Sequence, residues 1–78
     1  MIETSEYYVV KLFSIKNNKF TYLYEDNPYY DIYIANRFPS YEEGYTRMQK
    51  FFQWNGERKD FDMSKSKVCK ITLIEEDM

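Results

Sequence analysis

The sequence predicts an α+β fold: a four-stranded, mostly antiparallel sheet in the order β-β-β-α-β, with one helix packed on one face. Three observations lead to this prediction. Two runs rich in β-branched and aromatic residues flank a tight-turn sequence, a capping signal precedes a segment with helical spacing, and a last β-branched run ends the chain. Because 78 residues have room for one core, residues 1–78 are expected to form a single domain.

The first two predicted strands form a hairpin. Residues 7–15 (YYVVKLFSI) and 20–25 (FTYLYE) are strand-like, and Asn17-Asn18 between them suits a turn because Asn tolerates positive φ. If these two asparagines are the loop residues, Ile15 pairs with Phe20.

Both faces of this hairpin are apolar. One face carries Val9, Phe13, Ile15, Phe20, Tyr22 and Tyr24, and the other carries Tyr8, Val10, Leu12 and Leu23. One helix can cover one face, and the predicted loop at Glu57–Ser66 adds only Phe61 and Met63 as apolar cover. Either a partner or a second copy must then cover the face that the helix leaves open. We expect a two-fold homodimer through that face before a partner binds.

Two further strands are predicted, one before and one after the helix. Asp26-Asn27-Pro28 is expected to break the second strand, and residues 31–35 form a short third one. Residues 67–75 (KVCKITLIE) form the last strand. Short connections favour a meander, which places the last strand beside the first.

A capped helix is predicted from about residue 41 to 54. Ser40 is the expected N-cap and Glu43 completes a capping box. The apolar stripe that follows consists of Tyr41, Tyr45, Met48 and Phe52. Gly44 costs about 1 kcal/mol relative to Ala inside a helix, so it predicts a close approach of the helix to the sheet or to a partner.

The residue types argue against an enzyme and against a metal or cofactor site. The chain has no His and one Cys, so the usual general base, thiol dyad and zinc ligand sets are missing. Glu42 and Glu43 lie in the first helical turn, where negative charge is favourable without any catalytic role. Two glycines twelve residues apart cannot make a phosphate-binding loop.

The cysteine count, the apolar pattern and the net charge indicate where the protein acts and what it binds. One cysteine, no signal-peptide pattern and no long apolar run predict a soluble cytoplasmic protein that does not enter membranes. The net charge of −2 and the pI near 5.1 argue mildly against non-specific nucleic-acid binding.

These exclusions leave binding as the expected activity, with aromatic and basic residues as its means. The candidate partner-binding residues are Tyr7, Lys11, Tyr22, Tyr24, Arg58 and Lys59. Protein interfaces are enriched in Tyr and Arg, which favours a protein partner. Tyrosines that stack bases beside lysines that hold phosphate are the alternative, a small single-stranded nucleic-acid-binding or regulatory protein.

Residues 34–52 (IANRFPSYEEGYTRMQKFF) resemble a pattern in small phage and mobile-element proteins of low-GC Gram-positive bacteria. In that pattern, Ala-x-Arg/Lys-Phe ends a strand and a Ser caps a helix that opens with Glu-Glu-Ala. The matching positions are Ala35, Arg37, Phe38, Ser40, Glu42 and Glu43, whereas Gly44 departs from the usual Ala.

The resemblance implies a context in which several families inhibit host machinery stoichiometrically. The expected function is therefore a phage-encoded protein that binds and inhibits or adapts a host protein in the host cytoplasm, most sharply as an anti-CRISPR or other anti-defence factor. A structural phage component or a homo-oligomer without independent activity is a third possibility.

Overall fold

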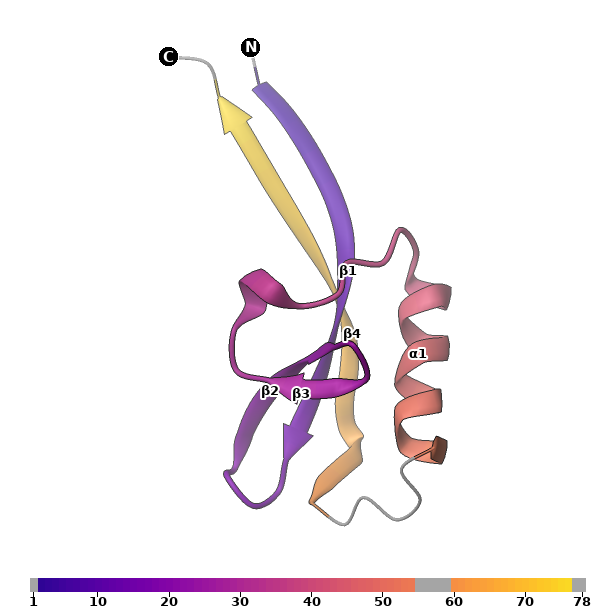
Figure 1. The fold of residues 1–78 in the computed structure, drawn as a ribbon. Coiled ribbons are helices and arrows are strands. Elements are labelled where there is room, and N and C mark those ends of the chain that lie inside the picture. The colour runs from indigo at the N-terminus through magenta and orange to yellow at the C-terminus, as the bar shows by residue number, and fades with distance from the viewer. Residues whose placement is uncertain (1, 55–59, 77–78) are drawn as a thin grey trace.

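The computed structural model describes residues 2–54 and 60–76, with side chains described for residues 5–53 and 60–73. Its elements are β1 (Ile2–Ser14), β2 (Lys19–Tyr24), β3 (Asn27–Tyr29), the 3-10 turn η1 (Ile32–Ile34), α1 (Tyr41–Trp54) and β4 (Phe61–Glu76). The strands form one antiparallel sheet in the order β3-β2-β1-β4, with α1 beside it (Figure 1). This confirms the predicted α+β class and the position of the last strand next to the first.

The first hairpin keeps the predicted faces but has a different turn. Phe13 pairs with Phe20, so Ile15–Asn18 form a four-residue turn and Ile15 has no partner in β2. Asn18 adopts the positive φ, 53°, that makes such a turn possible. The pairing differs from the prediction by two residues, and an even shift leaves every side chain on its expected face.

The prediction of a third strand at residues 31–35 is wrong. β3 lies earlier, at Asn27–Tyr29, because Glu25 and Asp26 both adopt positive φ, 48° and 64°, and close a two-residue hairpin loop. Pro28 is tolerated there because β3 is an edge strand. The segment predicted as a strand is instead η1, which the Asp31 carboxylate caps by accepting a hydrogen bond from the Tyr33 amide at 2.8 Å.

The first and last strands are longer than predicted. β4 begins at Phe61, inside the segment expected to be a loop, and β1 begins at Ile2. A bulge interrupts the β1–β4 ladder: Lys11 pairs with Lys67, whereas Phe13 pairs with Asp62. The sequence reads as irregular there because the bulge breaks the alternation, although the strand continues on both sides of it.

Ser66 holds the bulge together. Its hydroxyl accepts a hydrogen bond from the Phe13 amide at 3.0 Å and donates one to the Asp62 carbonyl at 2.8 Å. The side chain is buried, so it supplies partners to backbone groups that the interrupted ladder leaves without strand pairing.

The helix matches its predicted bounds, and the Ser40 hydroxyl accepts a hydrogen bond from the Glu43 amide at 3.2 Å, as expected of an N-cap. Its buried face is rotated from the predicted stripe. Met48 and Phe51 are buried, whereas Tyr41 and Tyr45 are exposed and stack on each other at 5.8 Å.

Gly44 explains this rotation. A Cβ built at Gly44 would lie 3.0 Å from Cγ1 of Val68 on β4, so the helix backbone touches the sheet there, as its glycine predicted. Met48 and Phe51, one and two turns further on, then point into the core. The buried cluster is completed by residues of one face of the sheet, Val10, Leu12 and Leu23.

Candidate functional site

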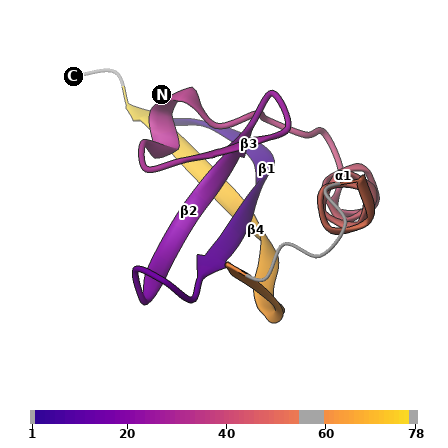
Figure 2. The same ribbon diagram turned by 60° about the horizontal axis from the view of Figure 1, so that its bottom comes forward.

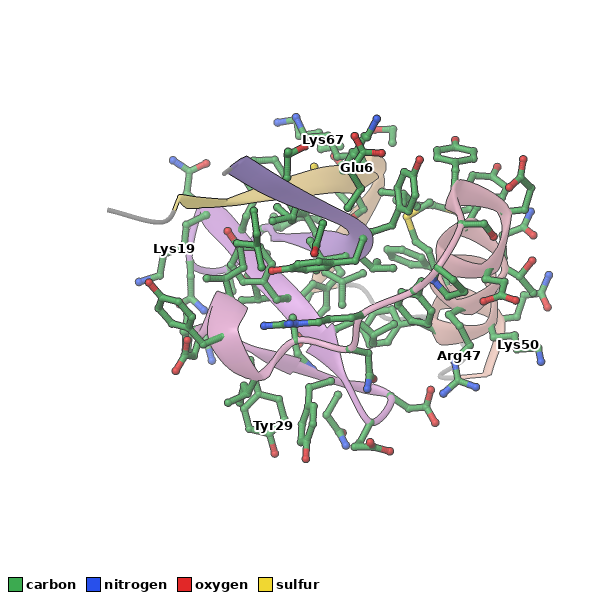
Figure 3. All side chains as sticks on the ribbon, turned by 90° about the horizontal axis from the view of Figure 1, so that it is seen from above. Glu6, Lys19, Tyr29, Arg47, Lys50 and Lys67 are labelled. Atoms are coloured by element: carbon green, nitrogen blue, oxygen red, sulfur yellow. The ribbon has the colours of Figure 1, made fainter. Side chains whose placement is uncertain are left out.

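The open face of the sheet is the face opposite α1, and one row of side chains crosses all four strands on it. The register pairs Tyr29 with Tyr22, Tyr22 with Lys11, and Lys11 with Lys67. Figure 3 shows Tyr29 and Lys67 at opposite sides of the molecule, as expected for the two ends of this row. The β2–β3 half of the row is therefore aromatic and the β1–β4 half is basic.

The basic half contains a cluster of three lysines, Lys11, Lys65 and Lys67, over phenylalanine rings. The ammonium groups of Lys11 and Lys67 lie 4.5 Å and 5.3 Å from the centroid of the Phe20 ring. Lys65 lies 4.8 Å from the centroid of Phe13, whose ring meets Phe20 edge to face at 5.2 Å. The lysine stems thus shield rings that the helix leaves uncovered, and their charges converge on one spot.

The open face is less bare than the sequence suggested. Val9 lies on it and is completely buried, and Phe13 and Phe20 are half-buried. The Arg37 guanidinium covers the Tyr7 ring at 4.4 Å. The segment that carries Arg37, residues 35–38, pairs with β1 through a β-bridge. In this bridge the Tyr8 and Phe38 backbones exchange two hydrogen bonds of 2.9 Å and 2.8 Å. Cation–π contacts and the 35–38 segment therefore do part of the covering that a second copy was expected to do.

The structure places four of the six predicted site residues together. Tyr7 and Lys11 on β1 and Tyr22 and Tyr24 on β2 share the open face and are all half-buried. The two remaining predicted residues, Arg58 and Lys59, lie outside the described residues. Lys65 and Lys67 supply the positive charge beside Lys11.

A second group of aromatics, the tyrosine surface, consists of Tyr29 on β3, Tyr30 in the bend that follows it and Tyr33 on η1. Tyr30 is 63% exposed and Tyr33 is 83% exposed. The Tyr30 hydroxyl accepts a hydrogen bond from Asn17 at 2.9 Å, and the Lys19 ammonium lies 4.9 Å from its ring centroid. Tyr29 points to the open face, where its ring meets Tyr24 edge to face at 5.4 Å. Tyr30 instead lines a small hollow with Thr21 and Pro28 on the α1 side of the sheet, so the tyrosine surface wraps around the β3 edge.

Sequence reasoning missed the tyrosine surface because it placed Tyr33 in a strand at residues 31–35 and gave no role to Tyr29 and Tyr30. The signal was present in NPYYDIYI, residues 27–34, where three tyrosines follow a proline and surround an aspartate. Asp and Pro favour turns, and a turn leaves tyrosines such as Tyr30 and Tyr33 on the surface.

The described residues include no group of three His, Cys, Asp or Glu side chains close enough to hold a metal ion. Cys69 is a free thiol, half-buried on β4. Asp62 is the one described group with a resolved shift: hydrogen bonds from the Ser64 hydroxyl, and then from its amide, hold the pKa of Asp62 below its usual range. That carboxylate caps the bulge, which is a structural task.

A hollow of about 360 Å³ lies between α1 and the segment that leads into it. It is lined by Phe38, Glu42, Glu43, Thr46 and Arg47. Arg47 is committed to Asp26 in the β2–β3 loop at 3.1 Å, a partly exposed ion pair that ties the helix to that loop. The hollow combines charges of both signs with one aromatic wall, which selects for no particular ligand.

No protein-family model, curated protein or solved structure matches this chain. None of the helices that the structure describes is long and apolar enough to cross a membrane.

Proposed function

We propose that this protein is a non-enzymatic binding protein that inhibits or adapts a host protein, with the tyrosine surface and the neighbouring part of the open face as its contact surface. One observation carries the proposal: Tyr30 is largely exposed and yet held in place by Asn17 and Lys19. Ordering a side chain at an interface costs roughly 0.5–1.5 kcal/mol. A tyrosine that is already ordered in the free protein avoids most of that cost, which is the property of an interface anchor.

The neighbouring residues support the same use. Tyr33 projects from η1, whose geometry is fixed by the Asp31 cap. Tyr22 and Tyr24 continue the aromatic surface on β2, and Tyr29 connects the two groups. Tyrosines dominate binding energy at many interfaces because each combines a large apolar area with a hydroxyl.

The binding test compares matched tyrosine variants. The wild-type protein, the double variant Tyr30→Ser/Tyr33→Ser and the control Tyr41→Ser, at a helix position that is 49% exposed, are used to capture proteins from host lysate. We expect one protein to be captured in the presence of nuclease, with affinity reduced by about 30-fold or more in the double variant. Tyr41→Ser should bind like the wild type. Equal losses in both variants would contradict a contact surface on β3 and η1.

The sharpest form of the proposal is a phage-encoded anti-CRISPR or related anti-defence inhibitor. It is supported by the resemblance of residues 34–52 to phage and mobile-element proteins. Its test is the plating efficiency of a targeted phage on a CRISPR-immune host that expresses the protein. Restored plating that is lost with Tyr30→Ser/Tyr33→Ser supports it, and unchanged immunity contradicts it.

Single-stranded nucleic-acid binding is the second candidate, and the lysine cluster favours it. Three ammonium groups converge on the Phe13–Phe20 pair, beside tyrosines that could stack bases. Labelled single-stranded DNA and RNA of mixed sequence are the probes. Three phosphate contacts predict roughly a 20-fold loss of affinity between 50 and 200 mM salt. Binding that falls this way and is lost in Lys11→Ser/Lys67→Ser, but not in Lys50→Ser on the helix, would transfer the function to nucleic acid.

A further inference from the structure

The outer edge of β4 is a long unpaired strand edge. β4 ends the sheet and has 16 residues, whereas the opposite edge strand, β3, has three. Within residues 2–54 and 60–76, no strand pairs with the outer side of β4. Such an edge presents backbone donors and acceptors to any strand of matching geometry.

Among the described residues, the C-terminal part of β4 lies beyond the core and pairs with β1 alone. β2 pairs with β1 only from Lys11 to Ser14, so residues 2–7 and 71–76 form a two-stranded ribbon that projects from the body of the molecule (Figure 1). The molecule measures 49 × 24 × 20 Å because of this ribbon. Figure 2 shows α1 packed to one side of the sheet, away from the ribbon. A two-stranded ribbon alone is marginally stable in water, so a third strand would stabilise it.

We propose that the strand which pairs with this edge is β4 of a second copy of the chain, antiparallel, about a two-fold axis at Ile71. Along a strand, the backbone N–H and C=O groups of successive residues point alternately toward the partner strand and away from it. In an antiparallel pair, two residues lie opposite each other only if both point these groups toward the partner strand or both point them away. An axis between two residues would place neighbours in the sequence opposite each other, and their backbone groups point in different directions. The two-fold axis of two identical antiparallel strands therefore passes through a residue. The possible centres near the middle of the regular β1–β4 ladder, which runs from Lys67 to Glu76, are Cys69, Lys70, Ile71 and Thr72. A centre further along, at Leu73, would pair only residues 70–76.

The bulge and the charges select Ile71 among these centres. The β1–β4 ladder is regular only from Lys67 to Glu76, so a pairing centred on Cys69 would run into the bulge. A centre at Lys70 would place that ammonium group against its own copy, which is destabilising. A centre at Thr72 would place Cys69 and Val68 opposite positions 75 and 76, both glutamates in the sequence.

A centre at Ile71 places unlike charges at the ends and apolar residues in the middle. Lys67 comes opposite position 75, a glutamate, and Lys70 comes opposite Thr72. Ile71 meets its copy, and Leu73, which is 46% exposed in the free chain, meets Cys69 of the second copy. Opposite-charge and apolar cross-strand pairs both stabilise an antiparallel pairing.

This edge is a better place for a second copy than the open face, where the sequence suggested one. Lys11, Lys65 and Lys67 cover the open face, and a face-to-face pair would bring two such clusters together. Edge pairing puts the two-fold axis perpendicular to the sheet, so both helices lie on one side and both open faces on the other. The result is one continuous eight-stranded sheet.

A cysteine scan across the edge tests the register. In a Cys69→Ser background, the single variants are Lys70→Cys, Ile71→Cys, Thr72→Cys and Leu73→Cys. Directly opposite residues bring their Cα atoms to about 4.5–5.5 Å, within the range of a disulfide. In a glutathione redox buffer, Ile71→Cys should form a covalent dimer at least tenfold faster than the other three. Fastest cross-linking at another position would overturn the proposed register.

Sedimentation tests the interface without cysteine chemistry. The wild type should pass from the 9.6 kDa monomer to a species of twice that mass as concentration rises a hundredfold. Ile71→Lys places two ammonium groups across the axis and should shift that transition to at least tenfold higher concentration. Met63→Lys changes another exposed apolar residue on β4, outside the pairing, and should leave the transition unchanged. A wild type that is monomeric at every concentration, or a dimer indifferent to Ile71→Lys, would overturn the proposal.

Discussion

Lys11 and Lys67 lie directly opposite each other on β1 and β4, and both ammonium groups lie over the ring of Phe20 on β2. Like charges in opposite positions on neighbouring strands are destabilising. The negative face of the aromatic ring offsets part of that repulsion. The arrangement keeps two positive charges together on the open face at a tolerable cost.

Replacing Phe20 with Leu should cost more than its loss of apolar area. Each cation–π contact at a partly exposed site contributes about 0.5–1 kcal/mol, and Phe20 makes two. We expect Phe20→Leu to cost about 1 kcal/mol less in a Lys11→Met/Lys67→Met background than in the wild type. Urea denaturation of the four proteins gives this difference. Equal costs in the two backgrounds would show that the ring contributes only packing.

Ser66→Ala should destabilise the fold by about 1–3 kcal/mol. The substitution leaves the Phe13 amide without its hydrogen-bond acceptor inside the bulge. Ser64→Ala is the control, because Ser64 is exposed and its hydroxyl bonds to the Asp62 side chain instead of the backbone. Thermal unfolding of the two variants should separate them clearly. If both lose the same stability, Ser66 does not hold the bulge.

Gly44→Ala should fail to give the stabilisation that the helix position offers. Alanine is favoured over glycine by about 1 kcal/mol in a helix interior, but the new methyl group would lie 3.0 Å from Val68. Val68 is β-branched and cannot easily turn aside. We expect Gly44→Ala to be neutral or destabilising alone and to stabilise by up to about 1 kcal/mol in a Val68→Ala background. The measurement is a double-mutant cycle of unfolding free energies, and additive effects would refute the contact.

Glu25→Asn should stabilise the protein by about 0.5–1 kcal/mol. Glu25 has a φ of 48°, which Asn adopts at lower cost than Glu, and the side chain is exposed. The hydrogen bond from its amide to the Asn36 side chain, 2.8 Å, comes from the backbone and survives the change. Glu25→Gln is the control: it removes the same charge, but Gln tolerates positive φ no better than Glu, so the free energy of unfolding should not change. A similar gain in both variants would assign the effect to charge.

The carboxylate of Asp62 should titrate below the usual range for Asp. Ser64→Ala removes the hydroxyl donor, the largest cause of that shift, and should raise the pKa of Asp62 toward its ordinary value. A folded-state pKa that is depressed contributes stability above the unfolded pKa, and the contribution is lost as pH falls through the folded pKa. The variant should therefore lose less stability on acidification. An NMR titration of the Asp62 side chain that is unchanged by Ser64→Ala would contradict this.

Local signals were enough to predict the helix and the faces of the hairpin. Ser40 and the apolar spacing identify a helix that needs no information from the rest of the chain. The faces were predictable because side chains alternate along a strand whatever its exact register. The residues that gather on the open face, Tyr7, Lys11, Tyr22 and Tyr24, follow from that alternation.

The third strand shows where local reading fails. Nothing local favours positive φ at Glu25, so the chain reversal there was not predictable from residue types. The reversal is supported from elsewhere, by Asn36 bonding to the Glu25 amide and by Arg47 of the helix pairing with Asp26. Because the chain reverses at Glu25 and Asp26, the third strand lies at Asn27–Tyr29. Residues 32–34, which were predicted to be in a strand, form the 3-10 turn that carries Tyr33.

Capping and the two periodicities act over a few residues, so they were enough to specify the α+β class, the helix bounds and which residues share a face. Long-range contacts set the hairpin register, the bulge at Ser66, the rotation of the helix and the convergence of three lysines on two rings. Each of these depends on groups that are far apart in the chain, such as Gly44 against Val68 or Phe13 against Ser66. Contacts of that kind are settled by packing and by the need of buried backbone groups for partners, which no local pattern records.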